Sequence, residues 1–230
     1  MSPRLSVAGL TAGYGDLAVL RDLSFDVAEG EILCITGRNG VGKTTLMRAV
    51  SGPIPLLAGH ITLNGQDVTA LATNKRQKLG LSYGPQENVS FAPLTVRENL
   101  TLHLDGHDLS RYKRLFRAFP RIEERLEQKA GSLSGGERKI LSFCRVMAEG
   151  GSLVALDEPT EGVAPENIAL MVDAIRAIAA EGTALAIVEQ NLTLVEAVAD
   201  KVIVIDHGEI VFRCMAMPNL RQEIEAKLRV

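Results

Sequence analysis

Residues 37–44 read Gly37-Arg38-Asn39-Gly40-Val41-Gly42-Lys43-Thr44 and fit the pattern G-x-x-x-x-G-K-[ST] of a phosphate-binding loop. An apolar run at 31–36 precedes them and a helical pattern follows, which are the flanks that such a loop needs. The glycines allow backbone amides to converge on phosphate oxygens, and the start of the helix adds a favourable dipole. The alternative is a glycine-rich turn without a ligand, but a chance match is expected in only roughly one chain in a hundred. The segment therefore predicts a nucleotide site, in which Lys43 reaches the terminal phosphates and the Thr44 hydroxyl is a magnesium ligand.

A second candidate feature follows an apolar strand. Residues 153–156 are all apolar, and the carboxylates Asp157 and Glu158 come directly after them. They are expected at the carboxyl end of the strand, where an open parallel sheet binds its ligand. We predict that Asp157 holds the magnesium shell and that Glu158 polarises a water for attack on the γ-phosphate. Because strands often end in acidic residues, this feature predicts a triphosphatase only together with the loop at 37–44.

Composition excludes several classes of protein. The chain has 230 residues, 46% of them hydrophobic, and its formal net charge is −3. A chain of this length can fold as one domain, alone or with a subdomain, without a metal or a disulfide. The near-neutral charge argues against a dedicated nucleic-acid binder. No apolar run approaches the roughly 20 residues that span a bilayer, and residues 1–10 lack a signal-peptide core, so we expect the chain to stay where it is made.

Short apolar runs alternate with helical patterns over most of the chain, which is typical of an α/β fold with helices covering a sheet. The expected strands span residues 5–10, 23–27, 32–36, 60–63, 79–83, 153–156, 184–188, 201–206 and 209–213. The expected helices span residues 42–51, 135–149, 165–180, 192–199 and 219–228. Between residues 87 and 132 the strand-like runs disappear and charge rises, which predicts a small helical insertion.

The predicted insertion carries its charge around an apolar stripe. Residues 111–129 hold seven basic and three acidic side chains, while Leu115, Phe119, Ile122 and Leu126 recur at helical spacing. Pro120 should end one helix or begin the next. A nucleic-acid surface is one interpretation of the basic excess. A solvated helical face is the other, and the interleaved acidic residues favour it.

A third motif lies between the insertion and Asp157. Residues 133–137 read Leu133-Ser134-Gly135-Gly136-Glu137 and precede a long helical pattern. Ser134 and Glu137 fit a capping box, so an ordinary helix start is one interpretation. Two consecutive glycines in a first turn cost a helix roughly 1 kcal/mol each relative to alanine. They are explained if a phosphate approaches the backbone, so the segment also predicts a second anion site.

In the order and spacing of these motifs the chain resembles the ATP-binding cassette (ABC) ATPases over essentially its full length. Residues 37–45 match the family's Walker A loop, 153–158 its Walker B strand and 133–137 its LSGGE signature. Tyr14 stands where the family places an aromatic that stacks on adenine, and Gln86 matches the glutamine that touches magnesium. The resemblance implies that ATP is held by Tyr14, Gly37, Asn39, Gly40, Gly42, Lys43, Thr44, Thr45, Gln86, Ser134, Gly135 and Gly136, and Mg²⁺ by Thr44, Gln86 and Asp157.

The resemblance also implies an architecture. It predicts a P-loop NTPase core with an antiparallel β-subdomain, formed by residues 1–86 and 133–230 of a single nucleotide-binding domain, and a helical subdomain at about 87–132. Two ATPase subunits, identical or different, are expected to pair head to tail around two ATP molecules. Each ATP then lies between the Walker A loop of one subunit and the signature of the other. The helical subdomain is the expected docking surface for membrane-spanning permease subunits, because Gln86 links it to the phosphate site.

Three further segments, 119–121, 157–165 and 188–191, are similar to those of branched-chain amino acid importer ATPases, while Thr160-Glu161-Gly162 is closer to urea importers. Gln190 stands where most ABC ATPases have a γ-phosphate-sensing histidine, and Ala164 replaces the usual aspartate; both changes are typical of this subgroup. The implied catalytic residues are Glu158, Gln190 and Lys43.

The implied function is ATP-driven uptake of a small polar solute through separate permease subunits, with a solute-binding protein as an indirect partner and no nucleic acid. The implied location is cytoplasmic, on the inner face of the cell membrane. One alternative is a non-transport ABC ATPase acting on ribosomes or DNA, but 230 residues leave no room for a second cassette or a long coiled coil. The other alternative is a nucleotide-gated regulatory module with little turnover. The presence of Glu158, the predicted water-activating residue, argues against it. The sequence does not identify the solute.

Arg138 and Lys139 are a local departure from the family pattern, which commonly has two glutamines there. They add positive charge to the first turns of a helix, against the preference of its dipole. The sequence alone assigns them no contact.

Overall fold

Two sheets of different topology form the body of the protein, as the computed structural model shows for residues 3–228 except 16, 88, 89, 103, 105 and 107. Among these residues the larger sheet has six strands in the order β10-β9-β3-β8-β7-β6, and only β9 and β10 pair antiparallel. Its strands are β3 (Ile32–Thr36), β6 (Leu81–Gly84), β7 (Leu153–Asp157), β8 (Ala184–Val188), β9 (Lys201–Asp206) and β10 (Glu209–Met215). The predicted α/β class is confirmed.

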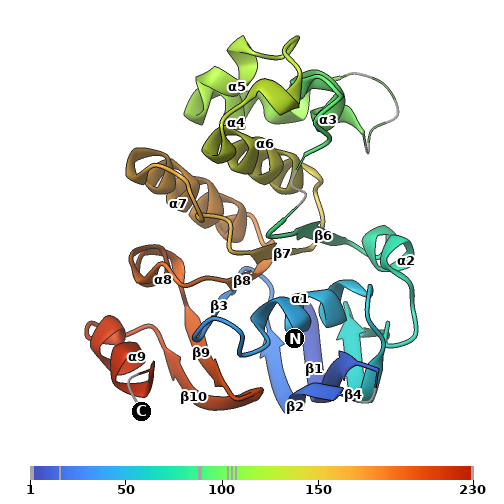
Figure 1. The fold of residues 1–230 in the computed structure, drawn as a ribbon, viewed down its shortest axis with the longest axis vertical. Coiled ribbons are helices and arrows are strands. Elements are labelled where there is room, and N and C mark those ends of the chain that lie inside the picture. Colours follow the sequence, from blue (N-terminus) through green and yellow to red (C-terminus); the bar gives the residue numbers. More distant parts are fainter. Residues whose placement is uncertain are drawn as a thin grey trace.

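The smaller sheet is antiparallel, with four strands in the described part of the chain in the order β2-β1-β4-β5. They are β1 (Leu5–Tyr14), β2 (Leu17–Val27), β4 (Leu56–Leu63) and β5 (Gln66–Asp67). Helix α1 (Lys43–Ser51) contacts strands of both sheets and contributes Leu46, Met47 and Val50 to the apolar cluster between them (Figure 1). The expected antiparallel β-subdomain is therefore present.

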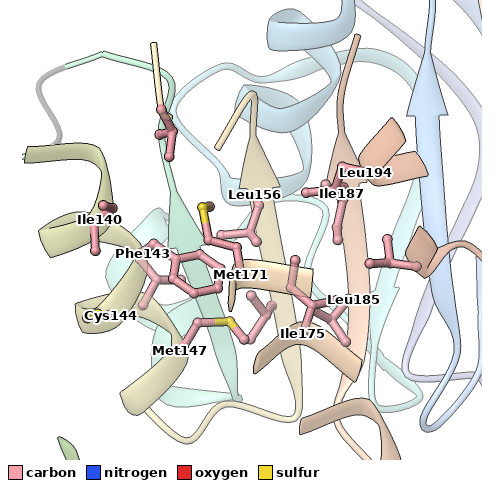
Figure 2. Packing of buried hydrophobic residues seen from close by; sticks show 14 of the residues in the cluster. Ile140, Phe143, Cys144, Met147, Leu156, Met171, Ile175, Leu185, Ile187 and Leu194 are labelled. Carbon is pink, nitrogen blue, oxygen red and sulfur yellow. The ribbon is translucent and has the colours of Figure 1, made fainter. Parts of the chain in front are cut away.

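Helices cover the other face of the six-stranded sheet. They are α6 (Gly135–Ala148), α7 (Pro165–Ala180) and α8 (Leu192–Val198). Figure 2 shows the side chains of Phe143 and Met147 from α6 pointing toward the cluster that contains Leu156 of β7 and Met171 of α7. Side chains of β3 alternate between the two clusters, since Cys34 belongs to this one and the flanking strand residues face α1. A strand buried on both faces is a continuous apolar run, which is why the sequence located it.

A helical segment lies at one end of the molecule, beyond α6 (Figure 1). It contains α3 (Val96–Thr101), α4 (Lys113–Ala118), α5 (Pro120–Glu124) and the single 3-10 turns Ser110–Tyr112 and Ala130–Ser132. Pro120 is the first residue of α5, as predicted, because its fixed φ suits that position and it lacks only an N–H that the helix does not use. Leu115, Phe119 and Ile122 are buried, whereas most basic side chains of 111–129 are exposed, which agrees with a solvated face.

Several predicted bounds were wrong at the sheet margins. β2 begins at Leu17 rather than residue 23, β4 at Leu56 rather than 60, and β1 includes Tyr14. β1 carries register shifts against both neighbours, which interrupt the period-2 alternation that marks a strand. Helix α2 (Thr73–Lys78) was not predicted, and Leu79 closes it instead of beginning β6. The last helix, α9 (Leu220–Leu228), is confirmed.

A buried arginine fixes the carboxyl end of α1. The Arg76 side chain is 2% exposed and its guanidinium donates to the carbonyls of Ala49 and Val50, both at 2.7 Å. It also donates to Leu71 and Thr69 carbonyls at 2.9 and 3.0 Å. Burial lowers the pKa of this group. A cation at a helix C-terminus is stabilised by the helix dipole, so Arg76 holds the far end of the helix whose first residue is Lys43.

Candidate active site

The loop at 37–42 connects β3 to α1 in a conformation that depends on glycine. Gly40 and Gly42 have φ values of 81° and 109°, a region that favours glycine. A Cβ at Gly42 would also lie 2.6 Å from Leu20 Cδ2. Lys43 is 4% exposed and folds back over the loop, with Nζ donating to the carbonyls of Gly37 at 3.0 Å and Arg38 at 2.9 Å. The ammonium is thus held at the centre of the loop.

A cavity of about 290 Å³ opens over this loop. Its lining residues come from three separate parts of the chain and are Val19, Asn39, Gly40, Gly42, Lys43, Thr44, Thr45, Gln86 and Glu158. All except Val19 were predicted for the site. Gly37 does not line the cavity, but its carbonyl accepts a hydrogen bond from Lys43 Nζ. Val19 carries no sequence signal, because an apolar residue in a strand is ordinary.

Glu158 is the centre of the polar contacts. Its Oε2 accepts from Gln86 Nε2 at 2.9 Å, its Oε1 accepts from Gln190 Nε2 at 2.6 Å, and Lys43 Nζ lies 3.6 Å from Oε1. The residue has φ 47°, a conformation that costs a non-glycine residue free energy. Its backbone N–H donates to the Val188 carbonyl at 2.9 Å, which anchors the turn to β8. The three candidate catalytic residues Lys43, Glu158 and Gln190 therefore meet at one carboxylate.

Asp157 is suited to a metal. It is 1% exposed, and neither carboxylate oxygen has a hydrogen-bond partner. Asp157, Thr44 and Gln86 line one cavity of about 310 Å³, in which Thr44 Oγ1 donates to Gln86 Oε1 at 3.3 Å. Mg²⁺ is commonly bound by one or two carboxylates with water and substrate phosphates, so a carboxylate, a hydroxyl and an amide oxygen fit it. The described residues contain no cluster of three or more His, Cys, Asp or Glu side chains arranged for a metal.

Burial raises the pKa of Asp157 from 3.8 to about 6, and the charge of Glu158 adds to the effect. Between these two pH values the metal-free folded protein binds one more proton than the unfolded chain, so its stability falls as pH rises. We expect the full loss, about 3 kcal/mol, above pH 6. Urea unfolding of wild type and Asp157→Asn from pH 4 to 7.5 without Mg²⁺ measures it. Equal pH dependence in the two proteins would contradict the assignment.

Glu189 is a site residue that the sequence analysis missed. It is 2% exposed, and its Oε1 accepts from the Thr160 backbone N–H at 3.0 Å and from the Thr160 hydroxyl. Its Oε2 accepts from the N–H groups of Gln190 at 2.7 Å and Asn191 at 2.9 Å. One buried carboxylate thus joins the loop after β7 to the loop that carries Gln190. The available signal was an acidic residue directly after the apolar strand at 184–188.

The signature segment lies at a different cavity. Gly135 and Gly136 line a space of about 440 Å³ together with Glu161 and Gly162. No residue that lines this space also lines the cavity over Lys43. Both halves of the capping box are formed, with Ser134 Oγ accepting from the Glu137 N–H at 3.3 Å. A Cβ at Gly136 would lie 2.9 Å from the Gly162 carbonyl, so close packing also requires this glycine.

Tyr14 lies outside both cavities. It is 47% exposed, and its hydroxyl accepts a hydrogen bond from Arg48 Nη1 at 3.1 Å. Arg48 belongs to α1, one turn beyond Thr44. The ring is thus tied to the helix that follows the phosphate-binding loop, and its stacking on adenine stays a prediction.

Comparison with known proteins identifies the family. A family model of ABC transporters matches residues 20–161, which is more than half of the chain. The chain belongs to the ABC transporter family. Its ATPase activity follows from this membership and from the site described above.

The relatives within the family include both importer and exporter subunits. The chain is 32% identical to a probable branched-chain amino acid transport ATP-binding protein, LivF, of Archaeoglobus fulgidus, over 97% of each chain. It is 33% identical to the high-affinity branched-chain amino acid transport ATP-binding protein BraG of Pseudomonas aeruginosa, over 90% of this chain and 91% of that protein. It is also 33% identical to the lipopolysaccharide export system ATP-binding protein LptB of Escherichia coli K12, over 90% and 88%.

Solved ABC structures share the fold. A nucleotide-free ATP-binding cassette superposes with a TM-score of 0.84 at 22% identity over 99% of this chain and 98% of that one. An ATP-binding subunit of an ABC transporter gives a TM-score of 0.85 at 25% identity over 98% and 99%. The predicted P-loop ABC fold is confirmed.

Gln190 stands where, by the resemblance given above, most ABC ATPases have a histidine. A glutamine amide donates a hydrogen bond but holds no proton near neutral pH, so we expect no inflection from residue 190 in the pH profile of kcat. Gln190→His should introduce one near pH 6.5, and Gln190→Ala should lower kcat about tenfold. Steady-state ATPase assays from pH 5.5 to 9 check both. Unchanged hydrolysis in Gln190→Ala would remove Gln190 from the site.

Proposed function

We propose that this chain is the ATP-hydrolysing subunit of an importer for a small polar solute of the branched-chain amino acid or urea type. The observation that carries the proposal is the similarity to LivF and BraG, both branched-chain amino acid transport proteins, over at least nine-tenths of the chain. The segments at 157–165 and 188–191, on which the subgroup resemblance rests, lie at the active site.

Hydrolysis in this proposal uses the contacts around Glu158. Lys43 exchanges the Gly37 and Arg38 carbonyls for oxygens of the β- and γ-phosphates. Thr44, Gln86 and Asp157 hold Mg²⁺, which when bound neutralises charge on those phosphates. Glu158 orients and polarises the attacking water, and Gln190 donates its amide N–H to a γ-phosphate oxygen. Glu189 keeps the Gln190 backbone in place.

Two subunits complete the site in this proposal. The cavity over Lys43 and the cavity at Gly135 have no lining residue in common, and in this proposal each of them contacts a different ATP. Head-to-tail pairing of two chains, identical or different, brings the signature of one to the ATP of the other. A solved ATP-binding cassette with the same fold is dimeric with bound ADP and phosphate, at 17% identity and a TM-score of 0.80. Loss of the γ-phosphate then loosens the pair.

Permease subunits are the proposed recipients of that movement. We assign residues 1–86 and 133–230 to the nucleotide-binding core and about 87–132 to a helical subdomain that docks on the permease, with Gln86 between them. The proposed location is the cytoplasmic face of the cell membrane. No helix in the parts of residues 3–228 that the structure describes combines the length and apolarity needed to cross a bilayer.

Export is the second candidate, because LptB of E. coli is as similar in sequence as BraG. Both candidates use the same ATPase cycle and differ in the membrane partners and the direction of transport. Action on ribosomes or DNA has no comparable support among these relatives.

The test is reconstitution of the intact complex. The tagged chain is purified with its membrane partners from native membranes and placed in proteoliposomes. Import predicts that ATPase activity rises when the co-encoded solute-binding protein is added with leucine or urea on the side opposite ATP, and that the labelled solute accumulates on the side that holds ATP. A complex containing Glu158→Gln is the matched control and should accumulate none. Stimulation by lipopolysaccharide with no solute uptake would instead establish export.

A further inference from the structure

Lys139 reaches the active site from the signature helix. It is the fifth residue of α6, and its side chain is only 13% exposed. Nζ donates to the backbone carbonyl of Gln86 at 2.7 Å and to that of Glu158 at 3.2 Å. It also lies 3.7 Å from Glu161 Oε2. One ammonium therefore joins three segments of the chain: the start of α6, the segment at Gln86, and the segment that contains Glu158 and Glu161. These segments are more than 15 residues apart from one another in sequence.

The contacts are of a kind that positions the backbone. Gln86 and Glu158 bond to each other through their side chains, at 2.9 Å, whereas Lys139 holds both residues by their main-chain carbonyls. The side chains thus stay free to exchange partners when ATP and water arrive, while their Cα positions are fixed. Hydrogen bonds from an ammonium are roughly twice as strong as neutral ones, so the two loops are held firmly.

Direct contact with the nucleotide in the same chain is not the role that fits. Two of the three N–H donors of this ammonium are used by the carbonyls of Gln86 and Glu158, and Glu161 lies at ion-pair distance. Lys139 does not line the cavity over Lys43. The Glu161 side chain is 59% exposed, and an ion pair with so exposed a partner contributes little. The carbonyl contacts are therefore the ones that matter.

We propose that Lys139 is a positioning residue for hydrolysis. It sets Gln86 and Glu158 in register with the start of α6, so that a displacement of the signature helix moves the water-activating carboxylate and the metal-binding glutamine together. The inference rests on the proposed hydrolytic roles of those two residues. Glutamine, the residue that the family pattern leads one to expect at 139, lacks both the reach and the charge for three such contacts.

The test compares Lys139→Met with Lys139→Arg in the full-length chain. We expect Lys139→Met to lower kcat for ATP by about 10- to 100-fold, as small displacements of catalytic groups do, with KM within about threefold of wild type. Lys139→Arg keeps charge and reach and should recover most of kcat. Lys75→Met, at an exposed lysine of α2, is the matched control and should match wild type. Glu161→Gln should change kcat less than Lys139→Met does.

Hydrogen–deuterium exchange gives a second measurement that needs no turnover. The peptides around Gln86 and Glu158 should exchange faster in Lys139→Met than in Lys75→Met. A Lys139→Met protein with wild-type kcat and exchange would overturn the inference. Parallel losses in kcat, ATP affinity and melting temperature, with no recovery in Lys139→Arg, would also overturn it and leave a folding role. If wild type hydrolyses no ATP, the hydrolytic assignment fails, and the exchange data still decide whether Lys139 orders the two loops.

Discussion

The Glu158→Gln variant should bind ATP at least as tightly as wild type and hydrolyse it about 100-fold more slowly or worse. Glutamine preserves the shape of the side chain but keeps one acceptor oxygen in place of the two that accept from Gln86 and Gln190, and it is a poor acceptor of a proton from water. It also removes a negative charge 3.6 Å from Lys43 Nζ, close to where phosphate charge is expected. Phosphate release and equilibrium binding of a fluorescent ATP analogue measure the two effects separately.

The control for this variant is Glu166→Gln, an exposed glutamate in the first turn of α7, which should leave both quantities unchanged. Full turnover in Glu158→Gln would show that Glu158 is not the base. Lost binding together with lost hydrolysis would point to a collapse of the contacts around the carboxylate.

Lys43→Ala should act on binding itself. We expect ATP affinity to fall by about 10- to 100-fold, since a lost hydrogen bond to a charged group costs about 1.5–3 kcal/mol. The alanine also leaves the carbonyls of Gly37 and Arg38 without their donor and removes the cation beside Glu158. Lys43→Met, which keeps most of the side-chain volume, separates the loss of charge from the loss of packing and should weaken binding by a similar factor. Titration with the fluorescent analogue measures both, and unchanged affinity would count against the nucleotide loop.

Lys43→Ala tests nucleotide binding and Glu158→Gln tests hydrolysis, although the two wild-type side chains face the same point from different elements. Lys43 comes from the start of α1 and Glu158 from the end of β7, and they meet over the cavity. A double variant should show non-additive losses, since each residue partly compensates the charge of the other.

Local patterns in the sequence were enough to predict the buried strands, the phosphate-binding loop and the residue at which a helix begins. The glycine spacing of residues 37–44 specified the loop between β3 and α1, because backbone conformation there depends on the residues themselves. Buried strands such as β7 and β8 were located as apolar runs, and Pro120 marked the start of α5. The predicted ends of strands in the antiparallel sheet were wrong, because the register shifts of β1 interrupt the alternation of buried and exposed residues that marks a strand.

Tertiary structure alone decided which side chains surround Glu158. Glu189 and Lys139 join segments separated by up to 53 residues, and their roles depend on distances near 3 Å between groups that no periodic pattern relates. A carboxylate after a strand or a lysine near the start of a helix has many uses, and burial with a specific partner selects one. The sequence thus determined which chemical groups the site contains, while packing determined their geometry, because hydrogen bonds between distant segments form only once the two sheets and α6 have assembled.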